Sequence, residues 1–224
     1  GLRGMSATPV VLHGHFYQPP RVDPWLDRVP VEPSAAPFHD WNERILAECY
    51  RPLTEVPLLD GEGRVRDLVN VFEWISFDAG ATLLGWLAHE APAVLQALRQ
   101  ADACSRRRLG FGNALAAPYH HVILPLASPR DRRTEIRWGI HDFRRRFGRD
   151  PEGMWLPETA VDRATLEALA AEGIAFTVLA PHQVDPLPPG GAAGRVQLDG
   201  GRSIAVFTYD GALSHGVAFG AVLN

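Results

Sequence analysis

The sequence predicts an α/β fold with parallel strands, arranged as a β/α barrel. Patterns typical of strands alternate with patterns typical of helices, and no internal repeat interrupts that order. Five or six strand patterns can be counted, and the last pattern is an expected helix that runs into the end of the sequence. We therefore expect a barrel that is incomplete at the C-terminus. With 224 residues, 46% of them hydrophobic, the chain can bury the core of one domain or most of a larger one.

The first half of the chain begins with an apolar run that reads as a short buried strand. A long proline-rich loop follows, up to Pro37, and three aromatic side chains in it or just after it (Trp25, Phe38 and Trp41) indicate that it is packed. Pro92 is expected to open a helix. The expected strands are 10–13, 70–77 and the region 110–113, and the expected helices are 40–50, one around 83–87 and one around 92–98.

The second half carries the clearest helical stripe. Ile136, Ile140, Phe143 and Phe147 recur at helical spacing, and Gly148 provides the stop. The expected elements beyond it are a strand 153–158, a helix capped by Asp162 and ended near Gly173, a strand 176–179, a Pro/Gly loop 183–194, a hairpin 196–206 turning at 199–201, and a last helix capped by Ser214.

Polar side chains collect where these expected strands end. The C-terminal ends of barrel strands build the active site, so we expect at least half of these groups to line one pocket. Pro157 fixes its own φ and would hold Glu158 at a defined angle. The residues are His13, His15, Asp78, Asn113, His120 or His121, Glu158, His182 and Asp210.

Composition excludes several classes of function. The net charge of −4 and a pI near 6.1 argue against nucleic-acid and anionic-membrane partners. The sequence contains no lysine, which excludes Schiff-base chemistry, and Cys49 and Cys104 are too few and too far apart for a disulfide framework or a metal knuckle. There is no apolar run of membrane length and no signal peptide, so we expect a cytoplasmic protein.

Four segments of the sequence are distinctive: HGHFYQPPRVDPWL, GFGNALAAPYHHVILPL, GMWLPETAVD and FTYDGALSHGVAF. Together they resemble glycoside hydrolase family 57, in particular a bacterial branch of long members. The tryptophan-to-glutamate segment is the most specific, and the histidine-rich opening with Gln-Pro is less so. The resemblance covers nearly all of residues 10–224, and we expect residues 1–8 to be an N-terminal extension before a barrel domain at 9–224.

The resemblance implies a (β/α)7 barrel and retaining chemistry on α-linked glucans, as an amylase, 4-α-glucanotransferase or branching enzyme. It implies oligo- or polysaccharide substrates, no cofactor and no metal, and it assigns Glu158 as the nucleophile. A retaining enzyme needs a second carboxyl about 5 to 5.5 Å away. Asp210 is the candidate on a late strand, but its setting, TYDGALS, matches a different segment of the branch. We therefore expect the acid/base beyond Asn224, which puts the activity of this chain alone in doubt.

Several side chains are predicted to bind the substrate. Histidines can donate hydrogen bonds to sugar hydroxyls, and tryptophan rings can stack on sugar faces, although a tryptophan inside an apolar strand can equally be core. His120 and His121 are kept as alternatives, because adjacent strand residues point to opposite faces. The predicted binding residues are His13, His15, Gln18, Trp25, Asn113, His121 and Trp155.

Two other functions stay open at this point. The pattern His13-x-His15 also resembles the metal-binding opening of amidohydrolase barrels, with His121, His182 and Asp210 as further zinc ligands of a hydrolase or deacetylase. The missing lysine removes one common ligand of that class. The third possible function is glycan binding without catalysis, by a relative that has the pocket but lacks a complete pair of carboxyls.

Overall fold

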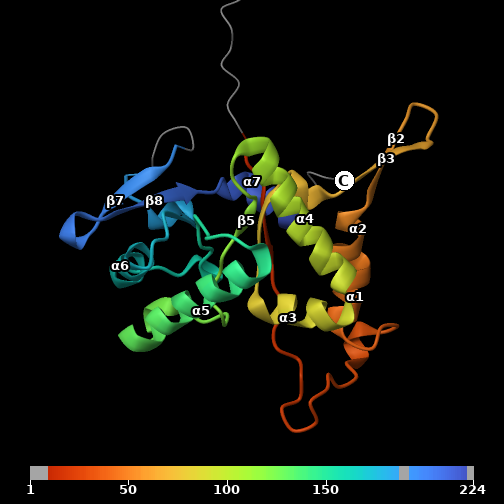
Figure 1. Cartoon of the computed structure of the whole chain (residues 1–224), viewed down its shortest axis with the longest axis horizontal. Helices are drawn as coiled ribbons and strands as arrows, with labels where there is room; N and C mark the ends of the chain where they lie inside the picture. Colours follow the sequence, from red (N-terminus) through yellow and green to blue (C-terminus); the bar gives the residue numbers. More distant parts are fainter. Residues whose placement is uncertain (1–9, 187–191, 221–224) are drawn as a thin grey trace, which may run out of the picture. The chain divides into compact units, whose positions relative to one another are not determined.

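A computed structural model describes residues 10–186 and 192–220 (Figure 1). The described chain divides into two compact units. Unit 1 comprises residues 10–16, 21–77 and 87–114, and unit 2 comprises 17–20, 78–86, 115–186 and 192–220. The backbone passes from one unit to the other inside two strands, β4 (Ser76–Ala79) and β5 (Ala114–Leu115), and inside helix α3 (Ala81–Glu90).

The core of unit 1 is a cluster of aromatic rings. Strand β1 (His13–Phe16) lies beside β4, which lies beside β5. The ring of Phe72 lies 5.1 Å from both Phe16 and Phe77, edge to face. Phe72 and Phe77 are fully buried. These contacts join the strands to the short 3₁₀ turn that carries Phe72.

The helices of unit 1 begin where the sequence predicts. The expected helix 40–50 is α1 (Trp41–Ile45), a π turn (Leu46–Tyr50) and α2 (Arg51–Thr54), all in one run. Asp40 caps this run by accepting hydrogen bonds from the backbone N–H groups of residues 42 and 43. Helix α4 (Pro92–Leu109) has its proline in the first turn and ends at Gly110, which adopts φ +86°.

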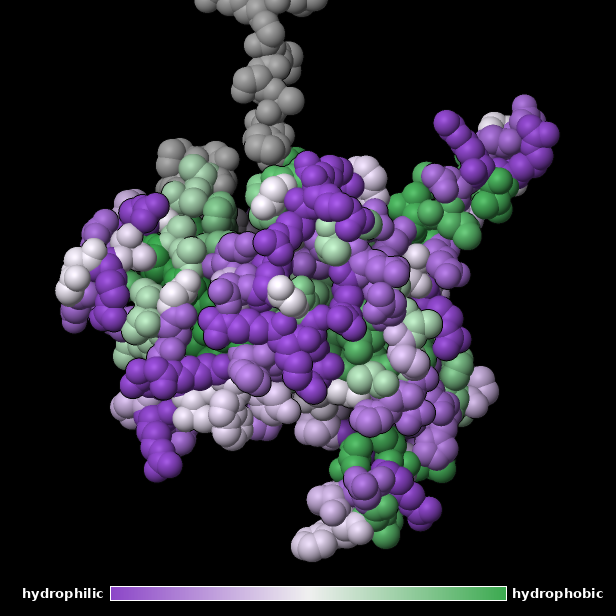
Figure 2. Space-filling view, in the orientation of Figure 1, coloured by the Kyte–Doolittle hydropathy of each residue, from purple (hydrophilic) through white to green (hydrophobic). Residues whose placement is uncertain are grey.

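The prediction of a strand at 70–77 was wrong over residues 70–75. The Asn70 side chain accepts a hydrogen bond from Phe72 N and turns the chain into a 3₁₀ turn, Val71–Glu73, so that the strand starts only at Ser76. A hairpin that the sequence analysis missed precedes it: β2 (Val56–Leu59) pairs antiparallel with β3 (Val65–Val69). Figure 2 shows apolar surface along this hairpin and a hydrophilic tip.

Unit 2 is built from parallel pairings that follow the order of the chain. Ala116 pairs with Met154, Gly153 with Phe176, and β6 (Phe176–Leu179) with β8 (Ser203–Thr208), all parallel. Strand β7 (Gly194–Gln197) adds to β8 as the expected hairpin. Helices α5 (Pro129–Phe147) and α6 (Arg163–Ala171) pack together, and α6 contacts β8 (Figure 1).

The ends of the helices in unit 2 have definite chemical causes. Gly148 ends α5 with φ +68°, as expected. Asp162 caps α6 by accepting hydrogen bonds from the N–H and hydroxyl of Thr165. Burial raises the pKa of Asp162, but these hydrogen bonds and the charge of Arg132 outweigh it, and the pKa lies below its usual value. The last helix, α7 (Gly211–Phe219), is capped by Asp210, so the expected cap at Ser214 was wrong.

The structure also corrects the predicted bounds of two strands and the predicted packing of one side chain. The first strand lies at 13–16 rather than 10–13, and Val10 to Leu12 are exposed; the third begins at Ala114 rather than 110. Trp25 is 91% exposed, so the prediction that it packs the proline-rich loop was wrong. Part of the expected loop 183–194 and the start of the chain lie outside the described residues. Within residues 10–186 and 192–220, no helix combines the length and apolarity needed to cross a bilayer.

Candidate active site

Glu158 lies where the chain leaves the interior of unit 2. Met154 and Leu156 are fully buried and Pro157 is buried, but the predicted strand 153–158 is reduced to two parallel bridges, at residues 153 and 154. The next side chain, Glu158, is 74% exposed. A short 3₁₀ turn, Pro157–Thr159, makes this change of direction. The sequence therefore anchors the backbone in the core and presents one carboxylate to solvent.

The backbone of this turn is strained. Glu158 and Thr159 have φ values of +56° and +52°, in the left-handed region that disfavours residues with a Cβ. Each such residue costs about 1 to 2 kcal/mol, and Thr159 is β-branched, which makes the conformation less favourable still. Strain of this kind persists only where the surroundings hold the turn in place, and it is found most often at functional sites.

Gln183 is one of the groups that hold the turn. Its Nε2 donates a 2.8 Å hydrogen bond to the carbonyl of Thr159, and its Oε1 accepts one of 2.8 Å from Ala180 N, just past β6. Thr159 N also donates to the carbonyl of Leu156 at 2.9 Å. The Gln183 side chain thus ties the Glu158 turn to the end of the neighbouring strand β6.

His121 is the side chain that faces Glu158. Its Nε2 lies 3.4 Å from Glu158 Oε1, and its side chain is only 15% exposed. The ring of Tyr17 stacks on the imidazole with 3.9 Å between centroids and 17° between planes. The stack limits rotation of the ring, so the nitrogen stays directed at the carboxylate. Tyr17 was not among the predicted site residues, although it lies inside the histidine-rich opening segment.

The adjacent histidine has a different partner. His120 Nδ1 lies 2.8 Å from Glu135 Oε1 on α5, and His120 N donates to Glu135 Oε2 at 2.8 Å. The two neighbouring imidazoles therefore bind different carboxylates: His120 binds Glu135 and His121 faces Glu158. Of the two alternatives, His121 is the one beside Glu158.

The other predicted residues of unit 2 have separate surroundings. Asp210 Oδ1 accepts a 2.9 Å hydrogen bond from Leu213 N as the cap of α7. Trp155 and Gln18 are each half-buried. The structure thus gives Asp210 a structural task at the start of α7.

The predicted residues of unit 1 divide into structural and exposed ones. His13 Nδ1 lies 3.0 Å from Ser76 Oγ, on the neighbouring strand β4. Asn113 accepts from Ser105 Oγ at 2.7 Å and donates to the carbonyl of Phe72 at 3.2 Å, which makes it a cross-link within the unit. His15 is exposed on β1, and Trp25 is exposed in the loop.

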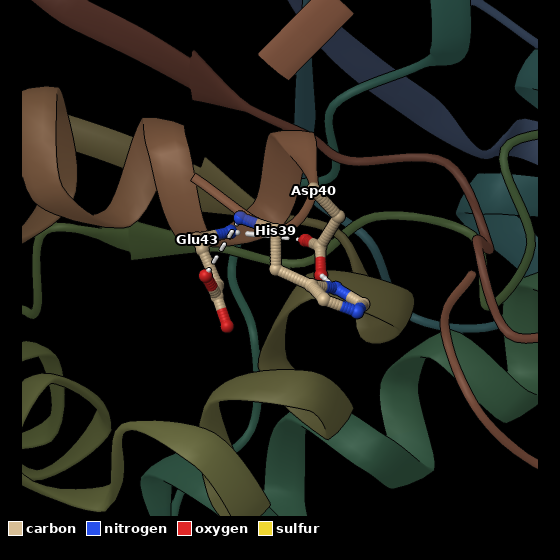
Figure 3. A group of neighbouring side chains, drawn as sticks. All are labelled: His39, Asp40 and Glu43. Carbon is tan, nitrogen blue, oxygen red and sulfur yellow. Dashed lines mark hydrogen bonds and ion pairs between the residues drawn. The ribbon is translucent and has the colours of Figure 1, made fainter. Parts of the chain in front are cut away.

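One cluster among the described residues has the composition of a metal site. His39, Asp40 and Glu43 offer ligand atoms within 4.8 Å of one another (Figure 3). Each also has a task at the start of α1: Asp40 Oδ1 caps the helix, Glu43 Oε2 accepts from His39 N, and His39 Nδ1 bonds to Asp40. This arrangement is a helix cap. It includes none of the histidines considered as zinc ligands.

Comparison with known proteins identifies the family. The model of Glycosyl hydrolase family 57 matches residues 12–221. A 4-α-glucanotransferase from Thermococcus litoralis superposes with TM-score 0.66 at 22% identity, over 95% of this chain and 29% of that one. An α-amylase from Thermotoga maritima gives 0.60 at 14% identity, over 92% and 46%.

A family 57 branching enzyme from Thermococcus kodakaraensis, solved with glucose, gives a TM-score of 0.55 at 16% identity, over 92% of this chain and 48% of that one. No curated protein sequence matches significantly. The chain thus spans 29 to 48% of these solved chains, and the likeness shows a common α/β fold of the β/α barrel type. Because the family model covers almost the whole sequence, the chain belongs to glycosyl hydrolase family 57.

Proposed function

We propose that this chain carries the nucleophile half of the active site of a retaining enzyme that hydrolyses or transfers α-linked glucans, with Glu158 as the nucleophile. The observation that carries the proposal is the exposed Glu158 carboxylate on a strained, braced turn beside His121. The family implies an oligo- or polysaccharide substrate. The solved relatives are a glucanotransferase, an amylase and a branching enzyme, which supports α-glucans as the class.

In the first step, a Glu158 oxygen attacks the anomeric carbon. The bond from that carbon to the glycosidic oxygen breaks, and the departing oxygen takes a proton from a carboxylic acid. In the second step, water or a sugar hydroxyl attacks the same anomeric carbon and gives its proton to the carboxylate that acted as the acid. The bond from that carbon to the Glu158 oxygen breaks, which frees Glu158. Hydrolysis, transfer and branching differ only in which acceptor arrives.

His121 has two tasks in this scheme. A hydrogen bond from Nε2 orients the carboxylate before attack. Once Glu158 is esterified, the same N–H can bind a hydroxyl of the attached sugar. The stacked Tyr17 keeps the imidazole in place through both steps.

The acid/base carboxyl is proposed to come from another part of the protein. Asp210, the candidate within this sequence, already serves as the cap of α7. The longer solved relatives leave room for that group, since this chain spans less than half of each. We further propose that residues 9–224 belong to one barrel domain; residues 1–9 lie outside the described part. A cytoplasmic location and the absence of nucleic-acid and membrane partners remain predictions.

Covalent labelling tests the nucleophile. A fluorinated α-glucosyl fluoride has a leaving group that needs no protonation, so a glycosyl-enzyme can form and accumulate without the acid. The wild type should gain one sugar mass, and the labelled peptide should contain Glu158. Glu158→Gln should abolish the label. Glu152→Gln is the matched control, because Glu152 lies in the same segment, is half exposed and pairs with Arg149.

Labelling of a different carboxylate, or unchanged labelling in folded Glu158→Gln, would overturn the assignment. A glycan-binding relative gives a third pattern: affinity for maltooligosaccharides that survives Glu158→Gln, with no label and no turnover.

A further inference from the structure

We propose that Tyr119, His120 and Trp138 form an aromatic platform that binds an α-glucan chain beside the Glu158 site. The substrate class rests on the proposed function. The three rings belong to unit 2 and contact one another: Tyr119 and Trp138 have centroids 5.9 Å apart, Tyr119 and His120 4.9 Å, and His120 and Trp138 6.3 Å.

The rings leave surface free for a ligand. The planes of Tyr119 and Trp138 meet at 86° and those of Tyr119 and His120 at 85°, so no two of them are stacked face to face. Trp138 is 53% exposed and Tyr119 37%. By contrast, the face of Trp74 in unit 1, which is also exposed, is covered by the Arg108 guanidinium 4.0 Å from the ring centroid.

The position of Trp138 on its helix is unusual. Helix α5 turns an apolar stripe inward, and its outer face carries arginines, two of which bind Glu172. Trp138 is the one large apolar side chain that α5 exposes. A single exposed apolar residue is normal on a protein surface, but a group of three contacting rings is a candidate binding surface. The C–H face of a glucose ring packs well against an aromatic face.

Glu135 makes the platform rigid. Its carboxylate binds both the backbone N–H and Nδ1 of His120, and its own carbonyl accepts a 3.1 Å hydrogen bond from Tyr119 N. Both residues of the loop are thus fixed to α5, one turn away from Trp138. Since Glu135 engages Nδ1, a sugar hydroxyl would meet His120 at Nε2. A preordered site loses less entropy when the ligand binds.

The platform lies within reach of a glucan held at Glu158. Tyr119, His120 and His121 are consecutive, so the Cα atoms of Tyr119 and His121 are at most about 7.6 Å apart. His121 contacts Glu158. The platform therefore includes the chain neighbour of the side chain that faces Glu158, and we infer a subsite for long α-glucans there.

Binding measurements on the Glu158→Gln background test the platform without turnover. Isothermal titration with maltoheptaose should show the Kd rising roughly three- to tenfold in Trp138→Ala, the range expected for loss of one aromatic contact. Trp138→Phe keeps a ring face and should lose less. Trp74→Ala is the control and should leave the Kd unchanged, because its face is already occupied.

An unchanged Kd in a folded Trp138→Ala protein, with Glu158 still labelled in the wild type, would overturn the platform and leave the proposed function standing. A raised Kd in Trp138→Ala without labelling at Glu158 would support the platform as a glycan-binding surface and contradict the proposed nucleophile. Circular dichroism of each variant excludes loss of fold as the cause.

Discussion

Replacing Thr159 by glycine tests whether backbone strain is stored beside the candidate nucleophile. Thr159 has φ +52°, which costs a β-branched residue about 1 to 2 kcal/mol. Glycine adopts this conformation freely, but it increases the conformational entropy of the unfolded chain, which lowers the free energy of unfolding by about 0.5 to 1 kcal/mol. Both main-chain hydrogen bonds of residue 159 survive the change.

The net effect of Thr159→Gly is a rise in the free energy of unfolding of about 0.5 to 1 kcal/mol. In a protein of this size, that gain raises the Tm by about 1 to 4 °C. The same change loosens the turn that aims Glu158, and a small displacement of a reacting group is costly, so labelling should slow by about tenfold or more. Stability and activity are therefore expected to move in opposite directions.

Thermal unfolding and the labelling rate are measured on the same preparations. Ala160→Gly is the matched control, since Ala160 has φ −66° and glycine there adds only entropy cost. Its Tm should fall. If Thr159→Gly also lowers the Tm, the strain argument is wrong. If it raises the Tm but labelling is as fast as in the wild type, the strain does not position Glu158.

Three further predictions follow from the packing of unit 2. Asp162→Ala should lower the free energy of unfolding by about 1 kcal/mol at pH 7 through loss of the cap, whereas Asp162→Asn should lower it much less. Because the native pKa of Asp162 is depressed, the charge-dependent part of this stability is complete above pH 4 and is lost as the pH falls through the native pKa. The free energies of unfolding at pH 7 and pH 3 should therefore differ less in Asp162→Asn than in the wild type. Gly139→Ala would place a Cβ 2.0 Å from the carbonyl oxygen of Ala117 and should destabilise by about 2 kcal/mol or more, whereas Gly61→Ala, which meets nothing within 4 Å, should be nearly neutral in the same melts. Gln183→Ala removes both hydrogen bonds of the brace, and labelling should slow with little change in circular dichroism; full labelling activity would show that the turn needs no brace.

The sequence predicts those elements of the fold that depend on local chemistry. The stripe of Ile136 to Phe147 with a glycine stop, the Asp162 cap and the hairpin at 199–201 each follow from a pattern within a few residues, and the structure confirms them. The hairpin β2–β3 was missed because neither of its faces is buried. Its apolar side chains are mostly exposed, so the sequence lacks the alternation of apolar and polar residues that marks a half-buried strand. The break at Asn70 depends on one side-chain hydrogen bond, which no periodicity reveals.

The candidate site was only partly visible in the sequence. Glu158 stands out because it follows a buried apolar run, and His121 was one of two alternatives. Which of the two histidines faces Glu158 depends on Glu135 on α5, which binds His120 from fifteen residues further along the chain. Tyr17 and Gln183 were missed as site residues, since each acts through a contact with a distant segment, a ring stack in one case and a carbonyl in the other.

The parallel order of unit 2 has a consequence for how the chain reaches its native state. The pairings of residues 116 with 154, 153 with 176 and 176 with 205 each close a loop of roughly 20 to 40 residues, and each loop joins a segment to one made earlier in the chain. Loops of these lengths differ in closure cost by only about 0.4 kcal/mol. The parallel segments of unit 2 can therefore dock in the order of the chain, whereas β7 can pair only once β8 is in place, and the Glu158 turn acquires its Gln183 brace only after β6 has docked.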